Sequence, residues 1–453
     1  MEINRRDFLR TLSGATAVAA SETLCGSGAG SASAQGAVES KKQLAAGLGN
    51  LREQFPIFQQ RNQGHPLIYL DSAATAQRPV KVINAIADYY RRVNANPART
   101  LHSLARQSAE HYEEARQTIA RFVNAGAAEE IVWTRGTTEA INLVASSWGS
   151  AYLHPGDEIL LSTSEHYSNL VPWQIAALRA RARLRFVDVD EEGALRLDQL
   201  GALLSERTRL VAISHVSNVL GRINPVKEIC ERARCAGASV LIDAAQSVPH
   251  FPVDVQDLGC DFLAFSGHKM MGPMGIGVLW ARREVLDNMP PYQSGSNMVH
   301  EVDLERVPTR FAEGGLKFEA GTPNVAGAVG LAAAVKFIES LNRGDLWRRE
   351  QELTRHALLR LREVDGLRLL GPSEAGDRVS IFSFVIDGIP ALDLVRALDE
   401  QGIAIRGGDL AARPLLNRLG VQAAARASAY IYTQSAEFDA LIEALLKLRR
   451  KKS

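Results

Sequence analysis

The sequence predicts an α/β protein with a mainly parallel central sheet covered by helices, followed by a smaller α+β domain. Seven short apolar runs recur between residues 131 and 280, and helical patterns separate most of them. Strands that alternate with helices in this way form parallel sheets. Polar side chains gather where these runs end, which is where open parallel sheets bind their ligands. After about residue 325, long helical patterns surround one alternating strand.

The predicted elements follow from the spacing of apolar residues. A strand at 68–71 and helices at 80–93 and 108–123 come first. The seven strands of the sheet are predicted at 131–134, 158–162, 184–189, 210–214, 239–243, 262–266 and 275–280, with a helix at 138–148 between the first two. The smaller domain is predicted to hold helices at 326–341, 346–363, 390–401 and 436–447 and a half-buried strand at 379–385.

Residues 1–34 predict a twin-arginine signal peptide. Arg5 and Arg6 precede an Ala/Gly-rich apolar stretch, and Ala32-Ser33-Ala34 supplies a small-residue cleavage pattern. The alternative is a tail that happens to contain two arginines. From this pattern we expect that the twin-arginine export machinery carries the protein to the periplasm. Because this route moves folded proteins, the protein would be exported already folded. The rest divides into a linker and N-terminal segment joining the small domain at 35–65, a large cofactor-binding domain at 66–325 and a small domain at 326–453.

Composition argues against several classes of function. The 453 residues carry 52 Lys and Arg against 51 Asp and Glu, a net charge of +1, which indicates no nucleic-acid partner. No apolar run after the N-terminal segment is long enough to cross a bilayer, so no membrane span is expected in the mature chain. The four cysteines have no CxxC spacing and no His cluster beside them, so we expect neither a metal site nor a disulfide framework.

Lys269 is the first candidate for catalysis. It follows the apolar run 262–266, which is typical of a buried parallel strand. A half-buried amine there is suited to a Schiff base with pyridoxal 5′-phosphate (PLP), the alternative being a lysine that extends from a core strand to solvent. A second strand ends at Asp243, whose carboxylate can pair with the pyridine nitrogen or serve as a helix N-cap. Gln246 is a candidate partner of the ring hydroxyl.

Other strand ends carry further candidates. Thr137 and Thr138 open a helix directly after a strand, where backbone N–H groups and hydroxyls can hold a phosphate or simply cap the helix. His166 can stack on a cofactor ring, although a lone histidine in a loop is more often a surface residue. Asn218 follows another strand in the same manner. Arg426 lies among small residues, where it suits a substrate carboxylate or a structural ion pair.

Four motifs in combination resemble those of the group II cysteine desulfurases, which include selenocysteine lyases and belong to the class-V aminotransferase family of fold-type-I PLP enzymes. The motifs are Tyr69-Leu70-Asp71-Ser72-Ala73-Ala74, Arg135-Gly136-Thr137-Thr138-Glu139-Ala140-Ile141-Asn142, Ser266-Gly267-His268-Lys269 and Phe318-Glu319-Ala320-Gly321-Thr322-Pro323-Asn324. The resemblance runs from about residue 50 to the C-terminus. It implies a homodimer with an active site at the subunit interface.

The resemblance also implies a role for each candidate. For the ring, it implies Lys269 as the Schiff-base lysine, Asp243 at the pyridine nitrogen, Gln246 at the ring oxygen and His166 as the stacking ring. For the phosphate, it implies Thr138, Ser266 and His268, with the partner subunit's Thr322. For the substrate, it implies Asn218 and Arg426 at the carboxylate, with Arg406 as a further contact.

The chain departs from the family at the loop that carries the sulfur-accepting thiol. Where the family has Arg-Thr-Gly-His-His-Cys-Ala, this chain has Arg406-Gly407-Gly408-Asp409-Leu410-Ala411-Ala412. Alanine cannot accept sulfur, and none of Cys230, Cys235 and Cys260 is an obvious substitute.

We therefore expect a PLP-dependent enzyme that acts on an amino acid or an amino-acid-bearing substrate by elimination or side-chain tailoring, without a protein persulfide. Cysteine sulfinate, selenocysteine and cystine are candidate substrates for elimination. Two alternatives remain. One is a cysteine desulfurase that takes sulfur from L-cysteine with a different thiol, and the other is a PLP-binding protein without turnover.

Overall fold

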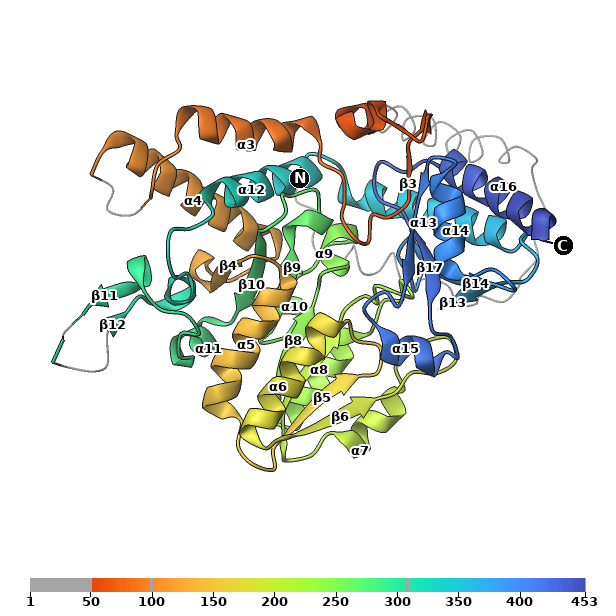
Figure 1. The fold of residues 1–453 in the computed structure, drawn as a ribbon. Helices are drawn as coiled ribbons and strands as arrows, with labels where there is room; N and C mark the ends of the chain where they lie inside the picture. The colour runs from red at the N-terminus through yellow and green to blue at the C-terminus, as the bar shows by residue number, and fades with distance from the viewer. Residues whose placement is uncertain (1–50, 98–100, 303, 306–309, 453) are drawn as a thin grey trace, which may run out of the picture. The chain divides into compact units, whose positions relative to one another are not determined.

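The computed structural model describes residues 51–97, 101–302, 304–305 and 310–452, and these described residues belong to one compact unit (Figure 1). The predicted signal peptide and the first part of the predicted linker lie outside the described residues. Export therefore stays a prediction. The domain boundary at residue 325 stays a prediction as well.

A seven-stranded sheet with the order β4–β10–β9–β8–β7–β5–β6 lies at the centre of this unit. Its strands are β4 (Ile131–Thr134), β5 (Glu158–Ser162), β6 (Arg183–Val187), β7 (Thr208–Ser214), β8 (Ser239–Asp243), β9 (Phe262–Ser266) and β10 (Gly277–Ala281). The neighbours from β9 through β8, β7 and β5 to β6 all pair in parallel. This confirms the predicted mainly parallel α/β fold.

Strand β10 is the exception, because it runs antiparallel to both β9 and β4. Residues 267–276 alone connect β9 to β10, and a parallel neighbour needs a longer crossover. The short connection begins with the 3₁₀ turn η6 (Gly267–Lys269). The chain therefore reverses directly after β9, which leaves Lys269 at the carboxyl end of a buried strand.

Helices α5 (Thr137–Tyr152) and α6 (Val171–Ala180) cover the sheet (Figure 1). Ile141, Val144 and Trp173 from these helices pack with Ile159 and Leu161 of β5 in one apolar core. Strands β5 and β9 are buried at every position, as is usual for strands of a parallel sheet between helical layers. Helices α3 (Val80–Arg92) and α4 (Ser103–Phe122) each pack against α12 (Val325–Glu339).

A second, antiparallel sheet has the order β13–β14–β17–β16. Its strands are β13 (Leu367–Leu370), β14 (Ile381–Ile386), β17 (Ala424–Ser428) and β16 (Arg406–Gly408), and its core is shared with α13 (Arg343–Leu361), α14 (Ala391–Asp399) and α16 (Ser435–Lys452). The strand predicted first in the chain, β3 (Ile68–Tyr69), pairs in parallel with β15 (Ile403–Ala404), and Asp71 forms an isolated bridge with Ser428. The segment at 68–71 thus joins the C-terminal sheet.

The remaining helices and strands are short: β1 (Arg61–Asn62), β2 (His65–Pro66), α7 (Leu200–Leu203), α8 (Val226–Cys235), α9 (Ser247–His250), α10 (Val255–Leu258), α11 (Arg283–Asn288), β11 (Val299–Glu301), β12 (Arg310–Phe311) and α15 (Arg413–Arg418). No single helix in the described part of the chain has the length and apolar character to cross a membrane, and only α12 with α13, bent by 81° at their junction, meets that criterion as a pair.

Candidate active site

One cavity of about 520 Å³ opens at the carboxyl ends of β7, β8 and β9, whose last residues Ser214, Asp243 and Ser266 line it. Its volume lies in the range of small-molecule sites, and its position is the one expected for a ligand of a parallel sheet. The cavity brings together all the predicted site residues except Thr322, namely Thr137, Thr138, His166, Asn218, Asp243, Gln246, Ser266, His268, Lys269, Arg406 and Arg426.

Lys269 and Asp243 face the same cavity. Burial lowers the pKa of the Lys269 amine to about 8, and the charge of Asp243 opposes part of this effect. Asp243 is 6% exposed and accepts a hydrogen bond from the Ala245 N–H at 2.9 Å. Burial raises the pKa of the Asp243 carboxyl, while Lys269 lowers it. A desolvated amine and a buried acid fit the aldehyde and the pyridine nitrogen of PLP.

The N-terminus of α5 fits the phosphate of the same cofactor. The backbone N–H of Thr137 donates to Ser266 Oγ at 2.8 Å, and the two hydroxyls are 2.7 Å apart. Thr138 Oγ1 lies 2.7 Å from Ser168 Oγ, so Ser168 joins the hydroxyls here although sequence reasoning missed it. A helix N-terminus that presents hydroxyls and N–H groups favours an anion. His268 lines the cavity as well, and burial lowers the pKa of its imidazole to about 4.

His166 follows β5 and is neutral at pH 7, because burial and the nearby Lys269 lower its pKa to about 4. Its Nδ1 accepts a hydrogen bond from the Ser168 N–H at 3.1 Å, which places the ring proton on Nε2. A neutral, flat ring in the cavity wall suits stacking on a cofactor ring, as predicted for this residue.

Glu165, which precedes His166, was missed by sequence reasoning. It is 1% exposed and accepts hydrogen bonds from Ser162 Oγ at 2.5 Å, Asn169 Nδ2 at 2.7 Å and the Ser214 N–H at 3.2 Å. Burial raises the pKa of its carboxyl to about 7, and these donors oppose the effect. Glu165 thereby joins the end of β5 to the end of β7. Ser162 and Asn169 are its sequence neighbours, but Ser214 is 49 residues away, so no local sequence signal could have found the link between the two strands.

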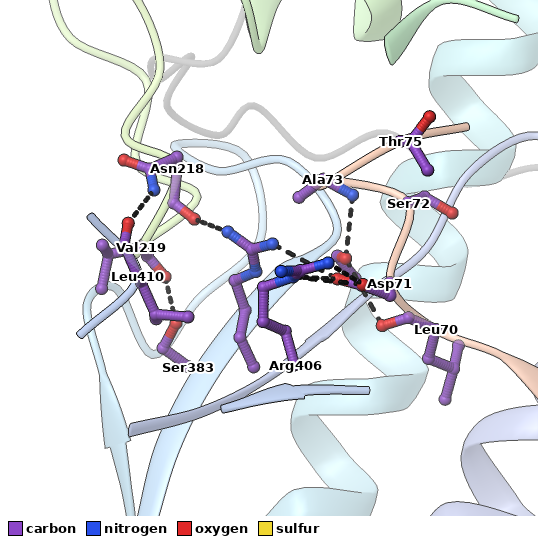
Figure 2. A network of polar contacts seen from close by, with 12 residues as sticks. Leu70, Asp71, Ser72, Ala73, Thr75, Asn218, Val219, Ser383, Arg406 and Leu410 are labelled. Atoms are coloured by element: carbon purple, nitrogen blue, oxygen red, sulfur yellow. Dashed lines mark hydrogen bonds and ion pairs between the residues drawn. The ribbon is translucent and has the colours of Figure 1, made fainter. Parts of the chain in front are cut away.

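Asp71 connects the two predicted substrate-binding arginines (Figure 2). Arg406 Nη2 donates to Asp71 Oδ2 at 2.8 Å, and Arg426 Nη2 lies 3.4 Å from Oδ1. Arg426 is 3% exposed, and its Nε has no hydrogen-bond partner among the described residues. Burial lowers the pKa of its guanidinium to about 10. Arg426 therefore forms an ion pair and still retains a donor for a ligand carboxylate.

Asn218 and Gln246 line the cavity, but each side chain already donates to the protein. Asn218 Nδ2 donates to the Leu410 backbone carbonyl at 2.8 Å, and the backbone carbonyl of Asn218 accepts from Arg426 Nη1 at 2.9 Å (Figure 2). Gln246 Nε2 donates to the Ala73 carbonyl at 2.8 Å. Both residues thus hold the cavity wall in place, and their direct contacts with substrate and ring stay predictions.

Ala411 lines the cavity on the loop that follows β16, and no cysteine among the described residues lines it. Cys230 and Cys260 are buried elsewhere, whereas Cys235 is exposed. Burial raises the pKa of the Cys230 thiol to about 12, which suppresses the reactive thiolate.

Thr322 lies outside the cavity of the single chain. It is exposed, and its hydroxyl accepts a hydrogen bond from Asn96 Nδ2 at 3.4 Å. Its predicted contact with a phosphate requires a second subunit, so both the contact and the homodimer stay predictions.

Comparison with known proteins identifies the family. The class-V aminotransferase family matches residues 68–441. A probable cysteine desulfurase of Halalkalibacterium halodurans is 46% identical over 399 residues, which cover 88% of this chain and 97% of that protein. The crystal structure of the cysteine desulfurase CsdA from Escherichia coli has a TM-score of 0.81 and 38% identity, and covers 88% of this chain and 98% of that one.

A more distant structure shows the cofactor. C-DES, described as a cystine C–S lyase, has been solved with its reaction product cysteine persulfide, with a TM-score of 0.74 and 25% identity over 87% of this chain and 99% of that one. A variant of C-DES carries glycine covalently linked to PLP. The cavity described above, at the carboxyl ends of β7, β8 and β9, fits that cofactor. The chain therefore belongs to the class-V aminotransferase family and is a PLP-dependent enzyme with the fold-type-I architecture.

Proposed function

We propose that the protein is a desulfurase of cysteine-type amino acids that passes sulfur to a thiol outside the cavity wall. One observation carries this proposal: a single cavity combines the amine of Lys269, the buried acid Asp243 and the buried cation Arg426. The similarity to proteins named cysteine desulfurases supports it. These relatives favour sulfur transfer over the side-chain tailoring that the alanine at position 411 led us to expect.

When bound, PLP withdraws electrons from the substrate and so weakens bonds at its α- and β-carbons. Lys269, with a pKa near 8, is placed to attach the cofactor and to move a proton at the substrate α-carbon at neutral pH. Asp243 would hold the pyridine nitrogen protonated. His166 would support the ring, and Arg426 would orient the substrate by its carboxylate.

The acceptor of the sulfur must come from elsewhere, because Ala411 offers no thiol. The reaction balances if the acceptor is a low-molecular-weight thiol that enters the cavity. Cysteine and an acceptor thiol give alanine and a persulfide of the acceptor: the C–S bond breaks, an S–S bond forms, and the thiol proton replaces sulfur on the β-carbon.

Elimination is the second candidate function, and the alanine at position 411 favours it. The C–S lyase activity named for C-DES supports this reading. Cystine and water would give pyruvate, ammonia and cysteine persulfide, a reaction that needs no protein thiol. Selenocysteine and cysteine sulfinate would react by the same route, because their leaving groups depart readily.

Product analysis separates the two functions. The PLP-loaded enzyme is incubated with L-cysteine plus a small thiol, and separately with L-cystine. Thiol-dependent alanine supports the desulfurase, pyruvate with ammonia supports elimination, and neither product from either substrate would refute both. Lys269→Ala should abolish all products. Ala411→Cys should make alanine formation less dependent on the added thiol, whereas loss of activity in a Cys235→Ser variant would show that the acceptor is a protein cysteine after all.

We further propose that the chain is exported by the twin-arginine route to the periplasm. We also propose that it acts as a homodimer in which each subunit contributes Thr322 to the phosphate site of the other. Both proposals rest on the sequence pattern and the family resemblance. Replacing Arg5 and Arg6 by lysine should retain the protein in the cytoplasm, as cell fractionation would reveal. A monomer in sedimentation analysis that still binds PLP tightly would contradict the shared site.

A further inference from the structure

Asp409 places a carboxylate in the wall of the cavity, on the loop after β16. Its charge opposes the fall in the pKa of His166, so the carboxylate lies within electrostatic reach of that ring. The side chain is 35% exposed, so it lines the cavity and is accessible to solvent. Among the described residues that line the cavity, only Asp243 and Asp409 are acidic, and Asp243 is the predicted partner of the cofactor.

Two hydrogen bonds hold the Asp409 carboxylate in place. Oδ2 accepts from the Tyr167 hydroxyl at 2.9 Å, and Oδ1 accepts from the Ala411 N–H at 3.1 Å. These donors, the Ala411 N–H first, lower the pKa of Asp409, so the group is ionised at neutral pH. The Tyr167 N–H also donates to the Ala411 carbonyl at 2.8 Å, which fastens the loop to the segment after β5.

The loop itself has an unfavourable backbone. Leu410 and Ala411 have φ angles of 51° and 54°, in the left-handed region that residues other than glycine rarely adopt. Such a conformation persists only where the surroundings impose it. Here the bond from Asn218 to the Leu410 carbonyl and the bond from Tyr167 to the Ala411 carbonyl impose it. The position of Asp409 is therefore set before any ligand arrives.

The charge of Asp409 is only weakly compensated. Arg413 Nη2 lies 3.6 Å from Oδ2, but its side chain is 65% exposed, so water screens the pair. Arg406 is bound to Asp71 by both Nε and Nη2 (Figure 2). His166 is neutral at pH 7. A negative charge thus remains in the wall of the cavity.

We propose that Asp409 selects the substrate by the charge of the substrate's side chain. It favours amino acids that carry a second ammonium group and disfavours those with anionic side chains. The inference rests on the proposed function, in which Arg426 binds the substrate α-carboxylate and Lys269 acts at the substrate α-carbon. The lining residues to which no role is assigned above include the loop neighbours of Asp409, namely Gly407, Gly408, Leu410 and Ala411, together with Ala73, Ala74 and Val216. Cystine, with its distal ammonium group, belongs to the favoured class. Cysteine sulfinate belongs to the disfavoured one.

Binding of three amino acids of similar length tests this inference: L-lysine, L-norleucine and L-2-aminoadipate, measured by calorimetry on the PLP-loaded enzyme. The wild-type protein should bind lysine at least about tenfold more tightly than norleucine, the order expected of one hydrogen-bonded charge pair, and aminoadipate most weakly. Asp409→Asn should bring lysine and norleucine within about twofold. Tyr167→Phe should reduce the preference, because it removes one of the two bonds that hold the carboxylate.

Asp393→Asn is the matched control, because it removes an exposed carboxylate 3.2 Å from Arg396 on α14. It should keep the wild-type ratio. Equal wild-type affinities for lysine and norleucine, or an unchanged ratio in Asp409→Asn, would overturn the role of Asp409 alone. Binding of none of the three amino acids, together with no product from cysteine or cystine, would overturn the proposed function and this inference with it. The wild-type comparison decides the question even if Asp409→Asn fails to fold.

Discussion

Replacing Asp71 by asparagine should destabilise the protein and increase its affinity for a carboxylate ligand. The substitution removes the anion shared by Arg406 and Arg426. The side chain of Arg406 is 50% exposed, so its half of the pair contributes no more than about 1 kcal/mol. The Arg426 side chain is 4% exposed, and leaving a buried charge unpaired costs about 3–5 kcal/mol. Because asparagine still accepts one hydrogen bond, we expect a net loss of about 2–3 kcal/mol.

A ligand carboxylate should restore part of this loss. In the variant the Arg426 guanidinium lacks its protein counter-ion, so a bound amino acid replaces a missing interaction instead of competing with Asp71. L-Alanine, the product of the proposed desulfurase reaction, should therefore bind more tightly to Asp71→Asn than to the wild-type protein. The added stability follows from linkage, because the ligand binds only the folded state.

Urea unfolding of the PLP-loaded proteins, followed by tryptophan fluorescence with and without L-alanine, measures both effects. Asp257→Asn is the control, because Asp257 pairs with Lys227 at 2.7 Å between side chains that are 61% and 53% exposed, a pair worth about 1 kcal/mol or less. The reasoning is refuted if Asp71→Asn loses no more stability than this control. Weaker alanine binding in the variant would equally show that Arg426 is not the carboxylate site.

The rate at which PLP attaches to the apoprotein should rise with pH around a midpoint near 8 instead of 10.5, because burial lowers the pKa of Lys269. Asp243→Asn should shift that midpoint lower, and cofactor absorbance measures both. Glu165 has a folded-state pKa near 7 against an ordinary value of 4.5, so the folded state binds the extra proton. Its contribution to stability should fall as pH rises from about 4.5 to about 7, by up to ~3 kcal/mol. Urea midpoints of Glu165→Gln across this range should lack that part of the slope, and parallel curves would contradict the assignment. Gly277→Ala should lose PLP faster on dialysis, because a Cβ there would lie 2.4 Å from the Cα of the residue before α5, whereas Gly201→Ala, which meets nothing within 4 Å, should not.

The residues that line the candidate cofactor cavity could be placed from local pattern alone. Apolar runs marked β8 and β9, and Asp243 and Lys269 stood at or just after their ends. Parallel strands bring their carboxyl ends to one edge of a sheet, so separate strand ends predicted a shared cavity. The direction of β10 was not predicted, because it depends on the length of the connection to β9 and not on the apolar pattern of the strand itself.

Contacts between distant segments had no such local signal. Asp71 and Arg426 are 355 residues apart, and Tyr167 and Asp409 are 242 apart. A carboxylate in a sequence does not reveal which cation or hydroxyl it will face, because packing of separate elements decides that. The left-handed backbone at Leu410 and Ala411 was equally unexpected, since neither residue type favours it and only the bonds from other segments maintain it.

The sequence alone was thus sufficient for the fold class, the cofactor and most residues that line the candidate cavity, because periodic apolar spacing and strand-end chemistry are local properties. Tertiary structure alone decided how the two arginines share Asp71, how Glu165 joins two strands and how Tyr167 directs Asp409 into the cavity. These are long-range pairings, and their energy comes from removing charges and donors from water together, which occurs only once the chain has folded.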